Sequence, residues 1–221
     1  MSQEFMREVD DEYRRDRAAQ FWKRWNGVIV GLAVLLVAAV GGWRYWQQSQ
    51  VQRAEAAAAR FDDAVRLARD GKGTEAEQAL AALSREAPDG YRLLARFRAA
   101  AEAGKREAAA GAAAYDALAD DTGVDGAMRD LARLRAAMLR LDAPDPAPAL
   151  ASLQGLASPT NAWRHTAREM LGLASLKRGD FEAATRWFDQ IVADRETPQG
   201  LRQRLEIYVA LAAGGPVQVT Q

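Results

Sequence analysis

Few side chains in this chain of 221 residues have the types and spacing that chemistry at a site requires. Cysteine is absent, and the single histidine, His165, lies in the stretch NAWRHTARE. Zinc sites are built from several thiolate or imidazole ligands, so the sequence predicts no zinc site. We expect His165 to lie on the surface or at the start of a helix.

Glycine spacings and carboxylate pairs are the other candidates for chemistry. Gly71-Lys72-Gly73 follows a predicted helix rather than a strand, so it lacks the strand-to-helix context of a phosphate-binding loop. Asp62-Asp63 and Asp120-Asp121 fall on polar helix faces or in turns, where solvated charge is the simpler interpretation. These patterns favour neither an enzyme nor a cofactor site.

The charge balance excludes a further class of function. The chain has 30 basic and 30 acidic residues, and the basic residues form no stripe of the kind that binds nucleic acid. The absence of cysteine fits a bacterial periplasm, where stray thiols would be oxidised. We therefore expect protein partners and no nucleic acid.

The elements that would position a functional group begin with an uncharged stretch, WNGVIVGLAVLLVAAVGGW, at residues 25–43. As an α-helix it would reach about 28 Å, close to the hydrocarbon thickness of a bilayer. We predict a transmembrane helix at residues 25–46. Aromatic rings at both ends, and an arginine that can snorkel outward, are typical of membrane–water interfaces. The predicted interface residues are Trp22, Trp25, Trp43, Arg44, Tyr45 and Trp46.

The basic flank predicts which way this helix points. Residues 14–24 contain five basic residues and one acid, whereas only Arg44 and then Arg53 follow the helix. The bias of basic residues predicts that the N-terminus is cytoplasmic and that the long C-terminal part is exported. The predicted division is a cytoplasmic tail at 1–24, a transmembrane helix at 25–46, a periplasmic domain at 47–213 and a flexible tail at 214–221.

Two alternatives for the apolar stretch stay open: a signal peptide cleaved near Ala39-Val40-Gly41, and a buried helix of a soluble protein. If the stretch is an anchor, Gly27 and Gly31 form a GxxxG pattern near its cytoplasmic end. This pattern would let another helix pack closely, although chance also supplies it often in such a composition.

The rest of the chain consists of short segments of helix-forming residues between turn residues, which predicts an all-α fold. Four turn markers are each followed five residues later by an alanine, at intervals of 33, 40 and 35 residues. These alanines are Ala76, Ala109, Ala149 and Ala184. Bulky residues follow four and seven positions later, except in the second unit, where Tyr115 and Leu118 indicate a slip of about one residue. The period predicts three or four helical hairpins stacked as a solenoid.

The last unit, at residues 171–198, resembles a tetratricopeptide repeat through Leu171-Gly172, the turn Gly179-Asp180-Phe181, Ala184, Phe188 and Pro198. With GWRYW at 42–46, the whole layout resembles the ancillary subunit of the bacterial Sec translocon, the YfgM-like family. This resemblance implies an inner-membrane protein with periplasmic repeats. Its implied partners are the SecYEG translocon, a membrane-anchored periplasmic chaperone such as PpiD, and nascent exported chains. A scaffold of another cell-envelope complex, in division or outer-membrane assembly, is the alternative.

The resemblance also implies where a partner binds, because the first helix of each tetratricopeptide pair lines the concave face. The residues that this register places there are Leu131, Leu134, Met138, Leu173 and Leu176, with Tyr91 and Leu94 as further candidates. An apolar face of this kind suits an unfolded segment or an amphipathic helix. The competing interpretation is that these residues form core, or are covered by the long helix expected over 48–70.

The predicted orientation can be tested with reporter fusions. A reporter that is active only in the periplasm should work when fused after Gln221 and should fail when fused at the N-terminus. The reverse pattern would contradict the orientation inferred from the basic flank.

Overall fold

The computed structural model describes residues 2–214, with side chains placed at 22, 23, 25–28 and 30–214. Every element in this part of the chain is an α-helix, which confirms the all-α prediction. In chain order the helices are α1 (Ser2–Arg69), α2 (Gly73–Glu86), α3 (Asp89–Arg106), α4 (Ala108–Ala119), α5 (Gly126–Arg140), α6 (Ala147–Leu156), α7 (Arg164–Lys177), α8 (Phe181–Val192) and α9 (Gln199–Gly214). The chain divides into two compact units, at residues 1–55 and 56–221, and α1 contributes to both.

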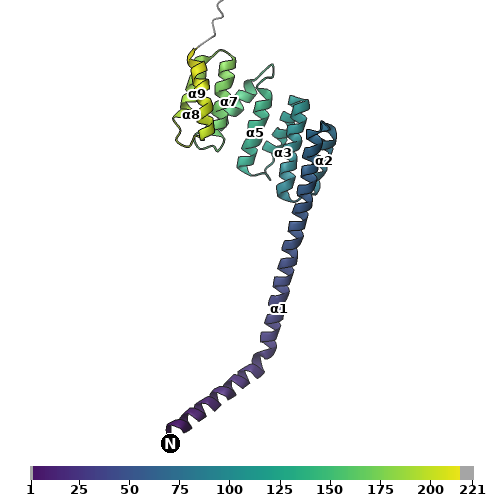
Figure 1. Cartoon of the computed structure of the whole chain (residues 1–221), viewed down its shortest axis with the longest axis vertical. Helices are drawn as coiled ribbons and strands as arrows, with labels where there is room; N and C mark the ends of the chain where they lie inside the picture. The colour runs from purple at the N-terminus through teal and green to yellow at the C-terminus, as the bar shows by residue number, and fades with distance from the viewer. Residues whose placement is uncertain (1, 215–221) are drawn as a thin grey trace, which may run out of the picture. The chain divides into compact units, whose positions relative to one another are not determined.

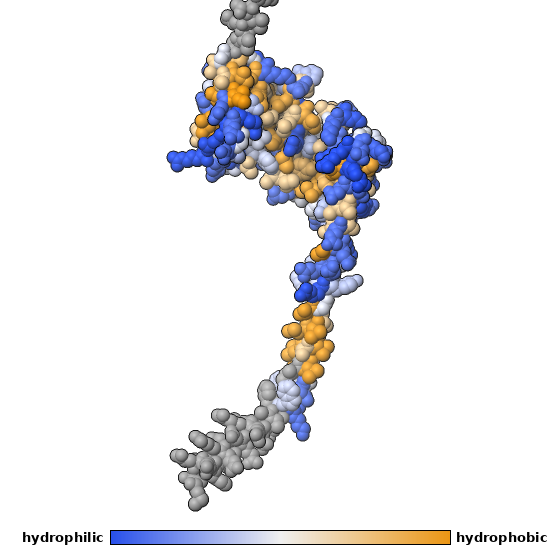
Figure 2. All heavy atoms as spheres, in the orientation of Figure 1, coloured by the Kyte–Doolittle hydropathy of each residue, from blue (hydrophilic) through white to orange (hydrophobic). Residues whose placement is uncertain are grey.

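The apolar stretch of the first unit lies within α1. Among the described residues, one helix is long and apolar enough to cross a membrane, with a mean hydropathy of 2.0 in its most apolar window. None of that window is buried by the rest of the described chain, and Figure 2 shows it as a band of apolar side chains on α1. A core helix of a soluble protein would be covered by other elements, so that alternative does not fit.

The second unit is a stack of antiparallel helical hairpins (Figure 1). The C-terminal part of α1 pairs with α2, α3 with α4, α5 with α6 and α7 with α8, and α9 packs on α8. Gly71 and Gly179, in the turns of the first and last hairpins, have positive φ angles of 79° and 75°. A residue with a Cβ atom is strained in this conformation, so both turns require glycine.

The second helix of each hairpin buries a small residue, followed by large residues four and seven positions later. The four sets are Ala76, Leu80 and Leu83; Gly111, Tyr115 and Leu118; Ala149, Leu153 and Leu156; and Ala184, Phe188 and Ile191. Three sets have the predicted register. The prediction for the second hairpin, which started from Ala109, is wrong by two residues. Asp116 lies outside the core there and forms an ion pair with Arg140.

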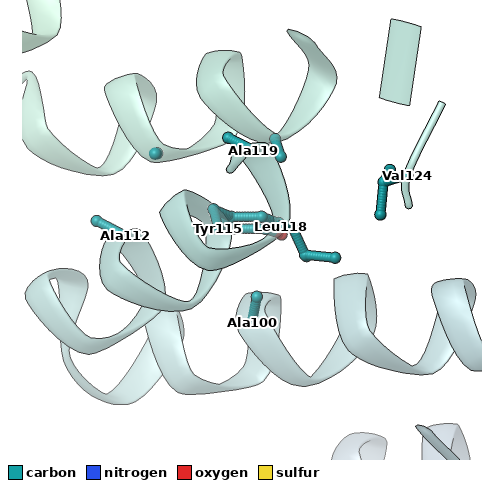
Figure 3. Packing of buried hydrophobic residues seen from close by; sticks show 8 residues of the cluster. Ala100, Ala112, Tyr115, Leu118, Ala119 and Val124 are labelled. Carbon is teal, nitrogen blue, oxygen red and sulfur yellow. The ribbon is translucent and has the colours of Figure 1, made fainter. Parts of the chain in front are cut away.

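Glycine accounts for the shifted register of α4. A Cβ atom at Gly111 would lie 2.3 Å from the Cα of Gly104 and 3.0 Å from the carbonyl oxygen of Ala100, both in the backbone of α3. The two helices therefore touch through their backbones, and only glycine fits at this crossing. Figure 3 shows Ala100 of α3 facing Tyr115 and Leu118 of α4, and these residues belong to one core cluster.

Side-chain caps begin two of the helices. Asp125 and Asp180 are the N-caps of α5 and α8, and their carboxylates accept hydrogen bonds from the backbone N–H groups of Ala127 and Ala183. Each cap satisfies a backbone donor that has no partner within its helix.

The glycine crossing makes a prediction about stability. Gly111→Ala should lower the free energy of unfolding by about 1–3 kcal/mol, because the new methyl group would push two backbones apart. Gly155→Ala is the matched control, since Gly155 lies in α6 and a Cβ there meets nothing within 4 Å. That variant should be unchanged or more stable by about 0.5–1 kcal/mol. Urea unfolding of the detergent-solubilised chain, followed by circular dichroism, measures both; equal effects would contradict the close crossing.

Candidate partner-binding surface

Two of the five residues predicted to bind a partner border an open groove, and three do not. Leu134 is 2% exposed and lies in the core shared by α5, α6 and α7, out of reach of a partner. Leu131 and Leu176 are half-buried against core clusters. Met138 and Leu173 are also half-buried, but their side chains line the groove. Of the five candidates, Met138 and Leu173 are therefore the two that line the groove, and their role in partner binding stays a prediction.

The groove has a volume of about 500 Å³ and lies between α5, the α5–α6 connection, α6 and α7. Its apolar lining consists of Met138, Leu141, Ala143, Pro144, Pro146, Leu150, Met170, Leu173 and Ala174. The α5–α6 connection, residues 141–146, is the longest of the four turns within hairpins. Its prolines cannot extend α5 or donate a backbone hydrogen bond, so one wall of the groove is a turn rather than helix.

Three charged side chains complete the lining of the groove. Lys177 donates a hydrogen bond to the carboxylate of Asp142, and both side chains are exposed. Arg178 is exposed as well, and its guanidinium has no hydrogen bond or ion pair with any other described residue. Arg178 and Leu150 also line an adjoining hollow of about 290 Å³ that reaches Arg186 on α8. Three cations and one acid therefore line these two hollows, which share Leu150 and Arg178.

The competing interpretation placed the long helix expected over 48–70 on top of the candidate residues. In the structure this part of α1 packs against α2 and α3 instead. Ala57 and Ala64 of α1 belong to a core cluster with residues of α2 and α3, and α1 contributes no described residue to the groove. The rings of Phe61 and Tyr91 lie 6.3 Å apart, so α1 contacts Tyr91. Leu94 is exposed on α3 but is not part of the groove lining. Neither further candidate is therefore associated with Met138 and Leu173.

The predicted membrane-interface residues are exposed on α1. This group consists of Trp22, Trp25, Trp43, Arg44, Tyr45 and Trp46. The rings of Trp43 and Trp46 lie 5.4 Å apart on one side of the helix. A Cβ atom at Gly27 or Gly31 would meet nothing within 4 Å, so no described element packs against the GxxxG pattern.

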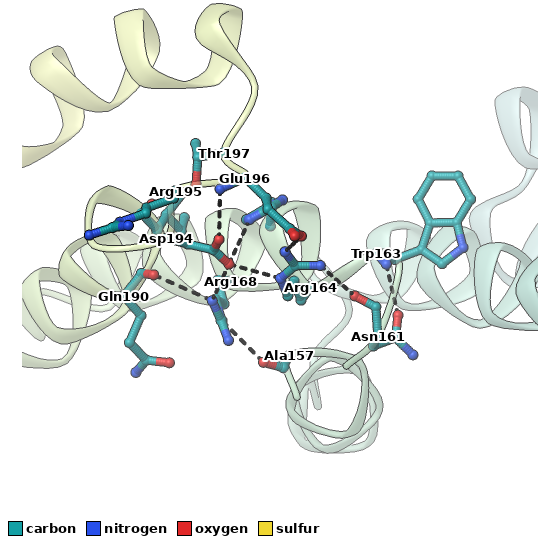
Figure 4. Close-up of polar contacts among 12 residues, drawn as sticks. Ala157, Asn161, Trp163, Arg164, Arg168, Gln190, Asp194, Arg195, Glu196 and Thr197 are labelled. Carbon is teal, nitrogen blue, oxygen red and sulfur yellow. Dashed lines mark hydrogen bonds and ion pairs between the residues drawn. The ribbon is translucent and has the colours of Figure 1, made fainter. Parts of the chain in front are cut away.

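A polar cluster ties α7 to the connection between α8 and α9 (Figure 4). Asp194 in that connection accepts a hydrogen bond from Nε of Arg164 at 2.8 Å, and Nε2 of His165 lies 2.9 Å from the same carboxylate. Arg164 also donates to Glu196 at 2.5 Å. The Arg164 guanidinium, the Glu196 backbone N–H and His165 together hold the pKa of Asp194 far below its ordinary value. His165 lies at the start of α7, as expected, and its ring contacts Asp194 in this cluster.

Arg168 extends this cluster into the interior. It is 6% exposed and donates to the carbonyl oxygens of Ala157, at 3.1 Å, and Gln190, at 3.3 Å. These contacts satisfy a buried cation and join α6, α7 and α8. Among the described residues, no group of three or more His, Asp or Glu side chains could hold a metal ion.

The hairpin stack has a counterpart among known proteins. The family model of the tetratricopeptide repeat-like domain matches residues 19–209. The chain belongs to this family. A relative described as an ancillary SecYEG translocon subunit, from Aggregatibacter actinomycetemcomitans, is 25% identical over 199 residues. The match covers 89% of this chain and 94% of the relative. No solved structure matches the chain.

The polar cluster of this tetratricopeptide repeat-like protein predicts how its stability depends on pH. The pKa of Asp194 is lower in the folded protein than in the unfolded chain, where it is about 3.9, so the folded state binds fewer protons. The stabilisation is therefore complete above about pH 4 and is lost as the pH falls below that value. Asp194→Asn should lower the urea midpoint at neutral pH, and its difference from wild type should shrink in acid.

Asp189→Asn is the control for this measurement. Asp189 is exposed on α8, and its carboxylate forms no hydrogen bond or ion pair with any other described residue. Its replacement should give little difference from wild type at any pH. If the Asp194→Asn difference stays constant from neutral pH to about pH 3, the ion-pair cluster does not provide the pH-dependent stability.

Proposed function

We propose that this chain is a membrane-anchored interaction module of the SecYEG translocon, with its N-terminus in the cytoplasm and its repeats in the periplasm. The observation that carries the proposal is the nearly full-length match to a relative described as an ancillary SecYEG translocon subunit. The tetratricopeptide repeat-like domain supports a role in protein binding, since stacked hairpins form extended interaction surfaces.

The apolar part of α1 would serve as the anchor of this module. Its length and hydropathy suit a bilayer, and the aromatic residues at both ends suit the two interfaces. Gly27 and Gly31 would allow close packing against a transmembrane helix of the translocon. A signal peptide cleaved near Ala39-Val40-Gly41 would remove this segment. The size of the mature protein therefore distinguishes a retained anchor from a cleaved signal peptide.

The partners of the repeat domain would be a periplasmic chaperone, such as PpiD, and newly exported chains. Both present apolar segments that an open groove lined by Met138 and Leu173 can accept. Methionine side chains are flexible and polarisable, which suits a surface that meets varied sequences. The proposal includes no enzymatic function, since the family and the translocon relative both favour protein binding.

Site-specific crosslinking in cells tests this proposal. A photoreactive amino acid at Met138 or Leu173 should give adducts with Sec subunits, a membrane-anchored chaperone or exported chains, because both side chains line the groove. Asp189, exposed on the other helix of the last hairpin, is the control position and should give few adducts.

Capture of the solubilised complex distinguishes the alternative function. Sec subunits should be the main proteins recovered with the full-length chain. Recovery of division or outer-membrane assembly proteins instead would favour a scaffold of another envelope complex. Silence at both groove positions, with adducts at the control position, would place the interaction surface elsewhere.

A further inference from the structure

We propose that the groove between α5, α6 and α7 binds a peptide segment in which a bulky apolar side chain lies next to an acidic residue. This inference rests on the proposed function, since it specifies the chemistry of the partner at the same surface. It depends on two features that sequence patterns did not bring together, an apolar hollow and an unpaired cation at its edge.

The hollow sets the requirement for an apolar side chain. Its volume of about 500 Å³ exceeds that of any single side chain, and its walls include two methionines and two prolines. The half-buried side chains of Leu150 and Leu173 leave apolar surface in contact with water. A leucine or aromatic side chain that enters this space would bury that surface, which is the main source of affinity at such sites.

The cations set the requirement for an acid. Lys177 is already paired with Asp142, whereas Arg178 has no partner among the described residues, and Arg186 is paired with Glu182 on its own helix. Arg178 lines both hollows, so a carboxylate beside a docked apolar side chain can reach it. A planar guanidinium forms paired hydrogen bonds with a carboxylate, and a basic peptide would meet repulsion here.

The occupant is a protein segment rather than a lipid headgroup, because the site combines a cation with a hollow of the size and apolar lining that a side chain fills. The two hollows share Leu150 and Arg178, and together their linings come from four helices, α5 to α8, which form two hairpins. An elongated site of this kind matches a chain of several residues, with one apolar anchor in the larger hollow. The smaller hollow, lined by Gln154, Gln190 and Arg178, offers polar partners to the peptide backbone.

Two matched peptides test the proposal with the full-length chain in phosphatidylcholine nanodiscs. Both peptides carry the same Leu-Phe pair, flanked by Asp and Glu in one and by Lys and Arg in the other. Fluorescence polarisation should show the acidic peptide binding at least about ten-fold more tightly, with a preference that weakens as salt is added. Equal binding, or tighter binding of the basic peptide, would overturn the proposal.

Variants assign the effect to the groove. Arg178→Glu should remove most of the preference, whereas Arg195→Glu, the same charge reversal at an exposed residue outside both hollows, should retain it. Ala174→Phe should fill the larger hollow and weaken the binding of both peptides, and it deletes no core side chain. Equal effects of the two charge reversals would overturn the proposal. Loss of acidic-peptide binding in phosphatidylglycerol nanodiscs would identify a lipid as the occupant and would overturn it as well.

The proposed function and this inference fail in different ways. Crosslinks from Met138 and Leu173 to Sec subunits, together with equal binding of the two peptides, would overturn only the peptide chemistry. A clear preference for the acidic peptide without Sec crosslinks in cells would leave the groove chemistry intact and would overturn the translocon as its partner.

Discussion

The close approach of the two helices within a hairpin is the contact on which the rest of the repeat domain depends. Gly104 and Gly111 bring the backbones of α3 and α4 together. In the last hairpin a Cβ atom at Gly172 would lie 2.3 Å from the ring of Phe188, a side chain that is fully buried. Each hairpin stacks on the next, so the separation of its helices sets the position of every hairpin that follows. A close contact inside one hairpin, whether between two backbones or between a backbone and a ring, therefore affects the arrangement of the whole domain.

The groove lies where the repeated geometry is interrupted. α6 has 10 residues, the fewest of any helix in the stack, and a connection of six residues precedes it. The other hairpins use turns of one to three residues, which bring the second helix directly back onto the first. The longer connection contains Pro144 and Pro146, and apolar side chains beside it, such as Leu173, stay half-buried at the groove. An interaction surface thus arises from a departure in one hairpin, while the other hairpins maintain the scaffold.

Much of this fold follows from the sequence, because hydrophobic period and turn residues are local signals. The apolar span, the helical hairpins and three of the four core registers could be predicted from residue spacing. The register of α4 could not, because nearly every residue at the start of AAAGAAAYDALA is small, and spacing alone does not identify the one that touches α3. Leu134 and Met138 lie one helical turn apart, and only the packing of α6 and α7 buries the first and leaves the second at the groove. Arg178 follows the end of α7, where no sequence pattern indicates that it faces an apolar hollow.

Under the proposed function, the anchor would change how strongly the groove needs to bind. A site that accepts one apolar side chain and one carboxylate provides a binding free energy only slightly larger than the cost of ordering a peptide. Its affinity in solution would therefore be modest. Confinement in the same membrane as a translocon raises the effective concentration of partner segments, and occupancy then no longer requires slow dissociation. Weak, rapidly reversible contacts suit a module that meets many different exported chains, since each must be released to fold. The half-buried methionines and Arg178, a groove residue with no ion pair to any described residue, are consistent with this regime, because together they recognise a chemical pattern rather than one sequence.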